Sequence, residues 1–293
     1  MKKMLLVVNP CSGTKKATKV LADIVAVFNR AEYDVSVYIT SAPGDGKETI
    51  ARRAKEMDLV VCCGGDGTFN ETVSGILLSG ANTPIGYIPT GSTNDFANSL
   101  GLPTEPIAAA KAIAGGTPHP YDVGSFNGRN FTYVASFGAF TRASYATPQN
   151  VKNALGHTAY VLSGISELSQ IHNIQVKMQL EEETFAGDYI FGAVCNSTSL
   201  GGIAKLDPSM VDMADGKFEI LLVRAPKNLA ELAECVAAVQ NKTYKCAMMT
   251  FRTASRITVE APTAFPWTLD GEMDPGSTEI QVENLHHAIS LVK

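Results

Sequence analysis

The sequence predicts a parallel α/β sheet in the first part of the chain and an antiparallel β structure in the remainder. This prediction rests on three observations. Up to about residue 120, apolar strand-like runs alternate with helical patterns, which is typical of βαβ units. Beyond that point, short alternating strand patterns dominate. Three glycine-containing turns directly follow strands of the first part, and ligands of parallel sheets bind at that edge.

The stretch 59–71 is the centre of the first part. Its five apolar residues, 59–63, predict a strand buried on both faces, and Gly64-Gly65 permits a tight turn. Thr68 and Glu71 have the spacing of a capping box, which predicts a helix from there to about residue 78. A glycine turn before a helix N-terminus presents free N–H groups and the positive end of a dipole, so we expect an anionic ligand.

Asp66 limits which anionic ligand can bind, because its carboxylate would repel a bare polyphosphate. We therefore expect a divalent cation or a hydroxyl donor, such as that of a ribose, next to this carboxylate. The turn fits neither common phosphate loop, since the dinucleotide fingerprint needs glycine where Asn70 stands and the Walker pattern is absent. A tight turn without a ligand is the alternative interpretation of these residues taken alone.

The other elements of the first part follow in order. We predict strands at 3–9, 33–39 and 85–88, and helices over 20–28, near 47–56 and around 107–114. Ser92 and Asp95 again have capping-box spacing, so a second helix should open after Gly91. The loops 9–13, 64–70 and 89–95 all follow strands, and we expect them to converge at the carboxyl edge of the sheet.

The second part is predicted to be an antiparallel β-sandwich. Strand patterns cover 121–126, 129–137, 173–181, 188–195, 217–223, 255–259, 265–269, 279–283 and 288–292. Helical patterns cover only 158–171 and 229–239. We therefore expect a Rossmann-like three-layer α/β domain over 1–120 and a β-rich domain over 121–293, with a cleft between them and a last strand that could return to the first domain.

Composition bears on nucleic-acid binding, membrane insertion and the state of the cysteines. The net charge of −5 gives no support for nucleic-acid binding. No apolar run of about 18 residues occurs, so we predict no transmembrane segment. The six cysteines lack C-x-x-C spacing, which is typical of reduced thiols in a cytoplasmic protein. The oligomeric state is left open, with a homodimer among the alternatives.

Four blocks together resemble a known family: Asn9-Pro10-x-Ser12-Gly13, Gly64–Asn70, Gly91-Ser92-x-Asn94-Asp95-Phe96-Ala97 and Leu269–Glu272. In this order they resemble the signature blocks of the bacterial diacylglycerol kinase-type lipid kinases, which are related to sphingosine kinases. NAD kinases, which are also related, and phosphofructokinases resemble this family at the Gly-Gly-Asp-Gly block, whereas the block from Ser92 to Phe96 and the late Asp270-Gly271-Glu272 favour the lipid kinases. The resemblance covers nearly the whole chain and implies an ATP-binding first domain and a lipid-acceptor second domain.

The resemblance also implies site residues. Asp270 and Glu272 fall on the catalytic block, with Glu272 favoured as the base that takes the acceptor proton, and Asp66 would act with Mg²⁺·ATP. Asp270-Gly271 is also a strong hairpin-turn dipeptide, so a plain turn is the alternative there. The implied nucleotide contacts are Asn9, Pro10, Cys11, Ser12, Gly13, Thr40, Gly64, Gly65, Asp66, Gly67, Thr68, Phe69, Asn70, Gly91 and Ser92.

A further acidic stretch, 207–218, resembles the segment in which some of these lipid kinases bind Mg²⁺. The matching ligands are Asp212, Asp215 and the carbonyl of Lys217, and a solvated turn is the alternative. His286-His287 has no other ligand type nearby in the sequence, so we predict no metal site there.

The resulting hypothesis is an ATP- and Mg²⁺-dependent lipid kinase, peripheral to the membrane during turnover, that phosphorylates the hydroxyl of a diacylglycerol-like glycerolipid or a sphingoid lipid. An apolar cleft lined from residues 130–200 should hold the acyl chain. The alternatives are an NAD kinase-like phosphotransferase and a non-catalytic nucleotide-binding regulator.

Overall fold

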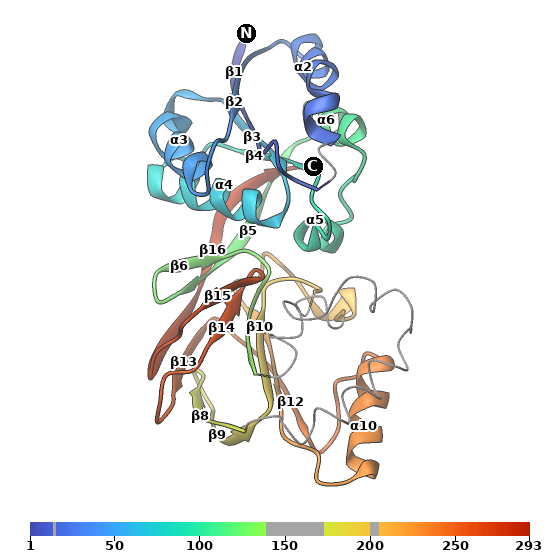
Figure 1. Ribbon diagram of the computed structural model, residues 1–293, viewed down its shortest axis with the longest axis vertical. Coiled ribbons are helices and arrows are strands. Elements are labelled where there is room, and N and C mark those ends of the chain that lie inside the picture. The colour runs from blue at the N-terminus through green and yellow to red at the C-terminus, as the bar shows by residue number, and fades with distance from the viewer. Residues whose placement is uncertain (14–15, 139–172, 200–204) are drawn as a thin grey trace.

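The computed structural model describes residues 1–13, 16–138, 173–199 and 205–293. It confirms the predicted fold class, with an α/β half that contains the N-terminus and a β-rich half (Figure 1). The predicted helix over 158–171 lies outside the described residues, as do residues 139–172 and 200 of the segment 130–200 expected to line an acyl-chain cleft.

The first half is built on four parallel strands in the order β2-β1-β3-β4. They are β1 (Lys2–Val8), β2 (Tyr33–Ile39), β3 (Leu59–Gly64) and β4 (Ile85–Pro89). All six residues of β3 are buried, which is the burial that its unbroken apolar run predicts for a central parallel strand.

Helices cover both faces of this sheet and make the predicted three layers (Figure 1). Side chains of α2 and α6 pack on one face, and side chains of α3 and α4 pack on the other. The helices are α1 (Lys16–Lys19), α2 (Leu21–Arg30), α3 (Asp45–Arg53), η1 (Ala54–Glu56), α4 (Asp66–Ser79), α5 (Asp95–Ser99) and α6 (Pro106–Gly115).

Two sheets face each other in the second half. The first sheet, which has ten strands in all, continues from the first half through β16-β13-β8-β9, with β5 and β6 alongside, and the second has the order β12-β11-β10-β7-β14-β15. A buried core that includes Phe126, Phe137, Val259 and Trp267 fills the space between them. The elements before the last strand are β5 (Pro118–Phe126), β6 (Arg129–Phe131), β7 (Val134–Gly138), β8 (Ile174–Gln179), β9 (Thr184–Tyr189), β10 (Phe191–Cys195), η3 (Pro208–Met210), β11 (Phe218–Val223), α10 (Leu229–Gln240), β12 (Met249–Ala254), β13 (Arg256–Glu260), β14 (Trp267–Leu269) and β15 (Glu272–Asp274).

The last strand, β16 (Glu279–Val292), joins the two halves (Figure 1). Its first part pairs with β13, and Leu291 near its end pairs in parallel with Ile85 of β4. The prediction of two separate strands, 279–283 and 288–292, was therefore wrong. A register shift between Leu285 and Ile289 interrupts the alternation without ending the strand.

Two other predicted strands are split. The stretch 129–137 breaks at Thr132 and Tyr133, because their backbone N–H groups donate to the Asp270 carboxylate instead of a neighbouring strand. The stretch 188–195 breaks at Ile190, where the chain passes from β9 in one sheet to β10 in the other. Only the last two residues of β9 were predicted to be in a strand, and β12 and β15 were not predicted at all.

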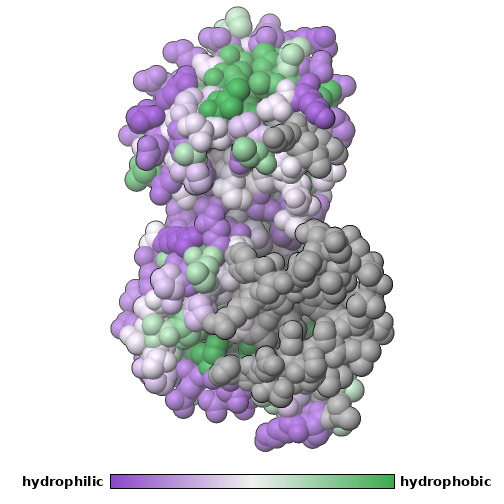
Figure 2. All heavy atoms as spheres, viewed as in Figure 1, coloured by the Kyte–Doolittle hydropathy of each residue, from purple (hydrophilic) through white to green (hydrophobic). Residues whose placement is uncertain are grey.

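The visible surface is mostly polar, with an apolar patch on the α/β half near β2 and α2 (Figure 2). Val37 and Ile39 of the edge strand β2 are 40% and 50% exposed. Among the described residues, no helix has the length and apolar character needed to cross a bilayer.

Candidate active site

The three predicted loops converge at the carboxyl ends of the parallel strands. Asn9 donates through Nδ2 to the Thr68 hydroxyl at 3.0 Å, which ties loop 9–13 to the glycine turn. A Cβ on Gly13 would lie only 2.2 Å from the Thr90 carbonyl oxygen, and one on Gly91 would lie 2.6 Å from Gly65 Cα. The backbones of the three loops therefore touch where only glycine fits.

Helix α4 begins at Asp66 with Gly65 as its N-cap residue, two residues earlier than predicted. The expected capping box between Thr68 and Glu71 is therefore wrong. The Thr68 hydroxyl accepts from Asn9, and the Glu71 carboxylate accepts from the Gly44 N–H at 2.8 Å. Both side chains hold neighbouring loops in place, and the N-terminal end of the α4 dipole lies within the loop cluster.

The second capping box is wrong as well, because Asn94, not Ser92, is the N-cap residue of α5 and has a left-handed conformation. Its amide closes the glycine turn: Asn94 Oδ1 accepts from the Gly91 N–H at 2.9 Å, and Nδ2 donates to the Gly91 carbonyl at 3.0 Å. Ser92 is exposed at the surface of this loop. Polar side chains of the loops thus satisfy the backbone of the turns.

The Asp66 carboxylate lies at the N-terminus of α5 and is only 8% exposed. It accepts from the backbone N–H groups of Asp95 and Phe96, at 3.1 and 3.2 Å, and from the Thr93 hydroxyl at 3.3 Å. Burial raises the pKa of Asp66, whereas the two N–H donors oppose the rise. Asp66 therefore connects the first glycine turn to the second.

Thr40 also reaches this edge of the sheet. Its N–H donates to the Val8 carbonyl at 3.0 Å, which places it beside the end of β1. The adjoining turn is held by Glu71 through Gly44. In the first loop, Ser12 is buried, whereas Cys11 and Gly13 are exposed.

Asp270 contacts the start of α4, which follows the glycine turn, although 200 positions separate it from Asn70 in the chain. Asn70 donates to its carboxylate at 2.8 Å. Four further donors come from the segment 132–134: the N–H groups of Thr132, Tyr133 and Val134, at 2.6, 2.9 and 3.1 Å, and the Thr132 hydroxyl at 2.8 Å. Burial raises the pKa of Asp270, and these hydrogen bonds oppose the rise.

Asp270 and Gly271 also form a hairpin turn between β14 and β15, since Leu269 pairs with Glu272. Both turn residues have positive φ, 49° and 86°, as a two-residue hairpin turn of this kind requires. The two interpretations of this motif are thus compatible, because the turn carries Asp270 to the early glycine loop.

Glu272 has a different environment from Asp270. Its side chain is 70% exposed and forms an ion pair with Arg129, Nη2 to Oε2, at 2.8 Å. Arg129 also binds Asp274 at 3.1 Å, so it holds two acidic side chains of β15. Glu272 therefore has a carboxylate open to solvent, which a residue that receives a proton from a substrate needs.

The acidic stretch 212–217 forms a turn before β11. Asp212 accepts from the Ala214 N–H at 3.0 Å, and Asp215 accepts from the Lys217 N–H at 2.9 Å, so each bond uses one oxygen of its carboxylate. Glu219 is nearby, 3% exposed, and its Oε2 atom is buried without a hydrogen-bond partner. Burial, together with the charges of Asp215 and Asp212, raises the pKa of Glu219 to about 8.

Some residues of this region were not found from the sequence. Arg129 lies in an Asn-Gly-Arg turn that matches no motif, and its role follows only from its contact with Glu272. In the sequence, Glu219 is one polar residue within an apolar strand pattern. Its burial close to Asp215, which sets it apart from other acidic residues, is visible only in the structure. Asn94 lies in one of the four family blocks. Its role as the N-cap residue of α5 was missed because Ser92 and Asp95 have the spacing of a capping box.

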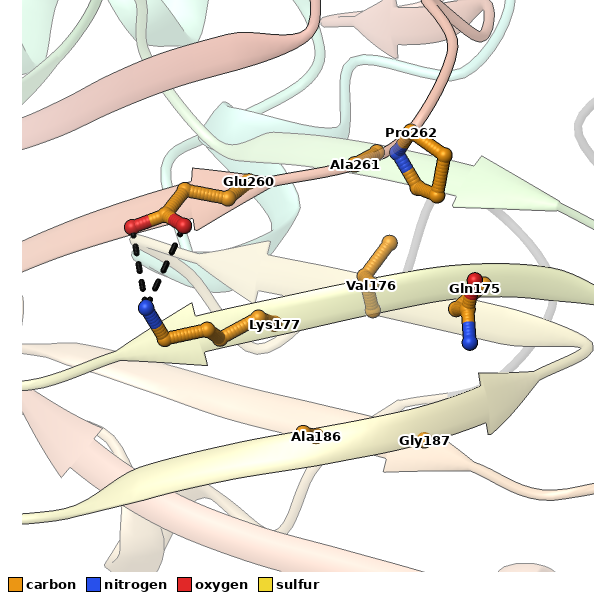
Figure 3. Close-up of a pocket in the computed structure, with 8 residues that line it drawn as sticks. All are labelled: Gln175, Val176, Lys177, Ala186, Gly187, Glu260, Ala261 and Pro262. Carbon is orange, nitrogen blue, oxygen red and sulfur yellow. Dashed lines mark hydrogen bonds and ion pairs between the residues drawn. The ribbon is translucent and has the colours of Figure 1, made fainter.

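A pocket of about 300 Å³ lies in the β-rich half (Figure 3). It is lined by β8, β9 and β13, and Lys177 and Glu260 form an ion pair beside it at 3.2 Å. None of the predicted site residues lines this pocket. The loop cluster around Asp66 and Asp270 is therefore the better candidate for chemistry.

Comparison with known families gives two matches that together cover nearly the whole chain. The model of the diacylglycerol kinase catalytic domain matches residues 3–126. The model of the YegS C-terminal NAD kinase beta sandwich-like domain matches residues 107–293.

Full-length relatives agree with these matches. The diacylglycerol kinase of Bacillus subtilis (strain 168) is 33% identical over 298 residues, which cover 100% of this chain and 96% of the relative. The diacylglycerol kinase of Staphylococcus saprophyticus is 31% identical over 92% of this chain and 89% of its own length. A crystal structure of a candidate diacylglycerol kinase from Bacillus anthracis has a TM-score of 0.83 at 26% identity, covering 99% of this chain and 96% of that one.

Proposed function

Because the chain belongs to the diacylglycerol kinase catalytic domain family of lipid kinases, we propose that it transfers the γ-phosphoryl group of ATP to the hydroxyl of a diacylglycerol-like glycerolipid. The observation that carries this proposal is the 2.8 Å hydrogen bond between Asn70 and Asp270. It brings the late acidic block to the start of α4, directly after the glycine turn at which a nucleotide phosphate would bind. The enzyme would work in the cytoplasm, at the surface of the membrane that holds its lipid.

We assign the nucleotide to the loop cluster formed by 9–13, 64–70 and 91–92, with Thr40 at its edge. The turns offer backbone N–H groups and the N-terminal end of α4, which suit phosphate oxygens. Phosphoryl transfer depends mainly on positioning and electrostatic stabilisation, so loops fixed by mutual backbone contact are a suitable scaffold.

We assign the proton transfer to Glu272. It is the exposed acid of the block, whereas the carboxylate of Asp270 already accepts five hydrogen bonds. Glu272 would take the proton of the acceptor hydroxyl as its oxygen bonds to the γ-phosphorus, while the bond from that phosphorus to the bridging oxygen breaks and ADP leaves. Asp270 would keep β15 and the glycine turn at a fixed separation, and Arg129 would hold the Glu272 side chain in place.

Mg²⁺ fits the residues of the acidic turn. Asp212, Asp215 and the carbonyl of Lys217 would hold the ion through oxygen atoms, which hard cations prefer. The charges of Asp215 and Asp212 help burial to raise the pKa of Glu219, so negative charge is concentrated at this turn, and a cation would offset it. A separate Mg²⁺ that enters with ATP would supply charge neutralisation for the phosphate oxygens. Asp66, at the start of α4, would act with the metal–nucleotide complex.

The proposal is tested with purified protein, Mg²⁺, ATP labelled at the γ-phosphate, and mixed micelles of detergent with diacylglycerol. Parallel reactions contain a sphingoid base or NAD in place of the glycerolipid. We expect labelled phospholipid in the diacylglycerol reaction. Label in NAD with none in any lipid would assign the chain to NAD phosphorylation, and label in the sphingoid base alone would move the acceptor to that class.

A further inference from the structure

The two consecutive histidines of β16 lie on the same side of the strand. In a regular strand, neighbouring side chains point to opposite faces. Here the register shifts between Leu285 and Ile289, and His287 has a positive φ of 51°, which is uncommon for a residue other than glycine. The rings of His286 and His287 consequently stack, with their centroids 3.7 Å apart. Bulges of this kind often re-aim side chains at functional sites.

A buried carboxylate lies beside this pair, so the absence of another ligand type, on which the prediction of no metal site rested, does not hold in the fold. The side chain of Asp122, on β5, is fully buried, whereas that of His286 is 50% exposed. Asp122 Oδ1 lies 3.0 Å from His286 Nδ1 and accepts from the His287 N–H at 2.8 Å. Its second oxygen accepts from the Gly216 N–H at 2.7 Å. The carboxylate is therefore held in one orientation, with the two imidazole rings between it and solvent.

The three side chains offer ligand atoms that all lie within 4.8 Å of one another. Two ligands of a tetrahedral Zn²⁺, each at about 2.0–2.2 Å, are roughly 3.3 Å apart, so the 3.0 Å between Asp122 Oδ1 and His286 Nδ1 suits a shared ion. His287 is exposed and offers the third ligand atom within the same 4.8 Å. Asp122, being fixed, would need no rearrangement.

We propose that Asp122, His286 and His287 form a binding site for a divalent transition-metal ion such as Zn²⁺. Two imidazoles and one carboxylate are a donor set for Zn²⁺, Co²⁺ or Ni²⁺, whereas Mg²⁺ prefers oxygen ligands. With three protein ligands, the ion keeps at least one position for water. The site is distinct from the acidic turn at Asp212 and Asp215.

The proposed zinc site lies between the strands β5 and β16. Asp122 belongs to β5 and the histidines to β16, the strand that joins the two halves of the molecule. Asp122 also binds Gly216, and His287 Nε2 lies 3.0 Å from the Ala214 carbonyl oxygen, so the acidic turn is attached to the same cluster. A bound ion would therefore link β5 to β16 next to the turn assigned to Mg²⁺.

Calorimetric titration of the tag-free protein with Zn²⁺ alone tests the site. We expect one equivalent to bind, and His286→Gln and His287→Gln each to raise the Kd at least about tenfold through loss of a ligand. Two control variants should bind as the wild type does: Asp212→Asn with Asp215→Asn, and Cys235→Ala with Cys246→Ala. The second pair is included because the Sγ atoms of Cys235 and Cys246 lie 3.8 Å apart and could themselves attract zinc.

A second measurement needs no variant. X-ray absorption of the zinc-loaded wild type should show imidazole and oxygen ligands and no sulfur. The proposal is overturned by an absence of Zn²⁺ binding, by unchanged affinity in both histidine variants, by loss of binding in either control, or by sulfur in the coordination sphere.

Discussion

Two acids of one short motif, Asp270 and Glu272, have opposite environments. Asp270 accepts five hydrogen bonds and is 9% exposed, whereas Glu272 has a side chain that is 70% exposed and pairs only with Arg129 among the contacts that the structure gives. A buried carboxylate that joins a loop to a hairpin contributes mainly to structure. An exposed one on the same hairpin is available to a substrate. We therefore expect substitutions at these positions to affect different properties.

Asp270→Asn should lower the free energy of unfolding by more than about 2 kcal/mol. The new amide group would face N–H donors and leave buried hydrogen-bonding groups unpaired. Glu272→Gln should change that free energy by less than about 0.5 kcal/mol, because its ion pair is at the surface. Urea denaturation of the two variants measures the difference. Equal stability of wild type and Asp270→Asn would contradict the structural role of Asp270.

For single residues, the sequence indicated which side chains belong to the candidate site but not which of them contact each other. Asn70 and Asp270 were both recognised in motifs, yet the bond between them spans 200 positions and depends on the completed fold. Arg129 and Asp122 lie in no motif. Their significance arises from the hairpins that bring them to Glu272 and His286, respectively.

At the scale of elements, the two glycine turns depend on close contact between their backbones. A Cβ on Gly91 would lie 2.6 Å from Gly65 Cα and 2.8 Å from Asn94 Oδ1. One on Gly67 would have no heavy atom within 4 Å, although Gly67 belongs to the same loop. This contrast supplies a matched pair of variants.

Gly91→Ala should destabilise the nucleotide-free protein by about 1–3 kcal/mol, since the turns must separate to admit the methyl group. Gly67→Ala should leave stability unchanged or raise it by up to about 1 kcal/mol, because alanine favours the first turn of α4. Thermal unfolding without nucleotide compares the two. Similar losses in both variants would show that the close packing is not the cause.

Asp45 provides a pH-dependent prediction. Hydrogen bonds from the Tyr38 hydroxyl and from Ser41 lower the pKa of Asp45 below its ordinary value of 3.8. A lowered pKa in the folded state contributes stability above the unfolded pKa, and this contribution is lost as the pH falls through the folded value. The wild type should therefore exceed Asp45→Asn in urea midpoint above about pH 5, and the gap should shrink below about pH 4. A gap that stays constant across this range would contradict the assignment.

The sequence predicted the elements of the first half well, because each has a clear periodicity and turn chemistry. It misplaced both helix starts at the glycine turns. Thr68 and Ser92 carry cap-like patterns, but tertiary contacts decide their role: Thr68 binds Asn9, and Asn94 caps α5. The strand breaks at Thr132 and Ile190 were missed for the same reason, since they follow from contacts with Asp270 and from the change of sheet.

At the scale of the whole molecule, β16 makes the two halves interdependent. It pairs with β4 and β5, and Ile289 and Leu291 enter the core of the first half. Without it, β4 would become an edge strand made only of buried residues. We propose a domain boundary near residue 120 along the chain. The first domain would then also include the end of β16, which comes from the C-terminal part of the chain.

Residues 1–126 alone should therefore aggregate or fail to unfold cooperatively. Fusing 282–293 to residue 126 through an Asn-Gly turn should restore a folded unit, because Phe126 and Val282 are opposite each other in the β5–β16 pair. Light scattering and thermal unfolding of the two fragments measure this. A monomeric 1–126 fragment with cooperative unfolding would contradict the prediction.

The rate of phosphoryl transfer to diacylglycerol, compared between Glu272→Gln and Asp274→Asn, tests the proposed function most directly. The two acids share β15 and the same partner, Arg129, so the variants disturb similar contacts. We predict that Glu272→Gln lowers kcat by about 10²- to 10⁴-fold through loss of the base, and that Asp274→Asn stays within a few-fold of the wild type. A wild-type kcat in Glu272→Gln would contradict the assignment of this carboxylate as the base.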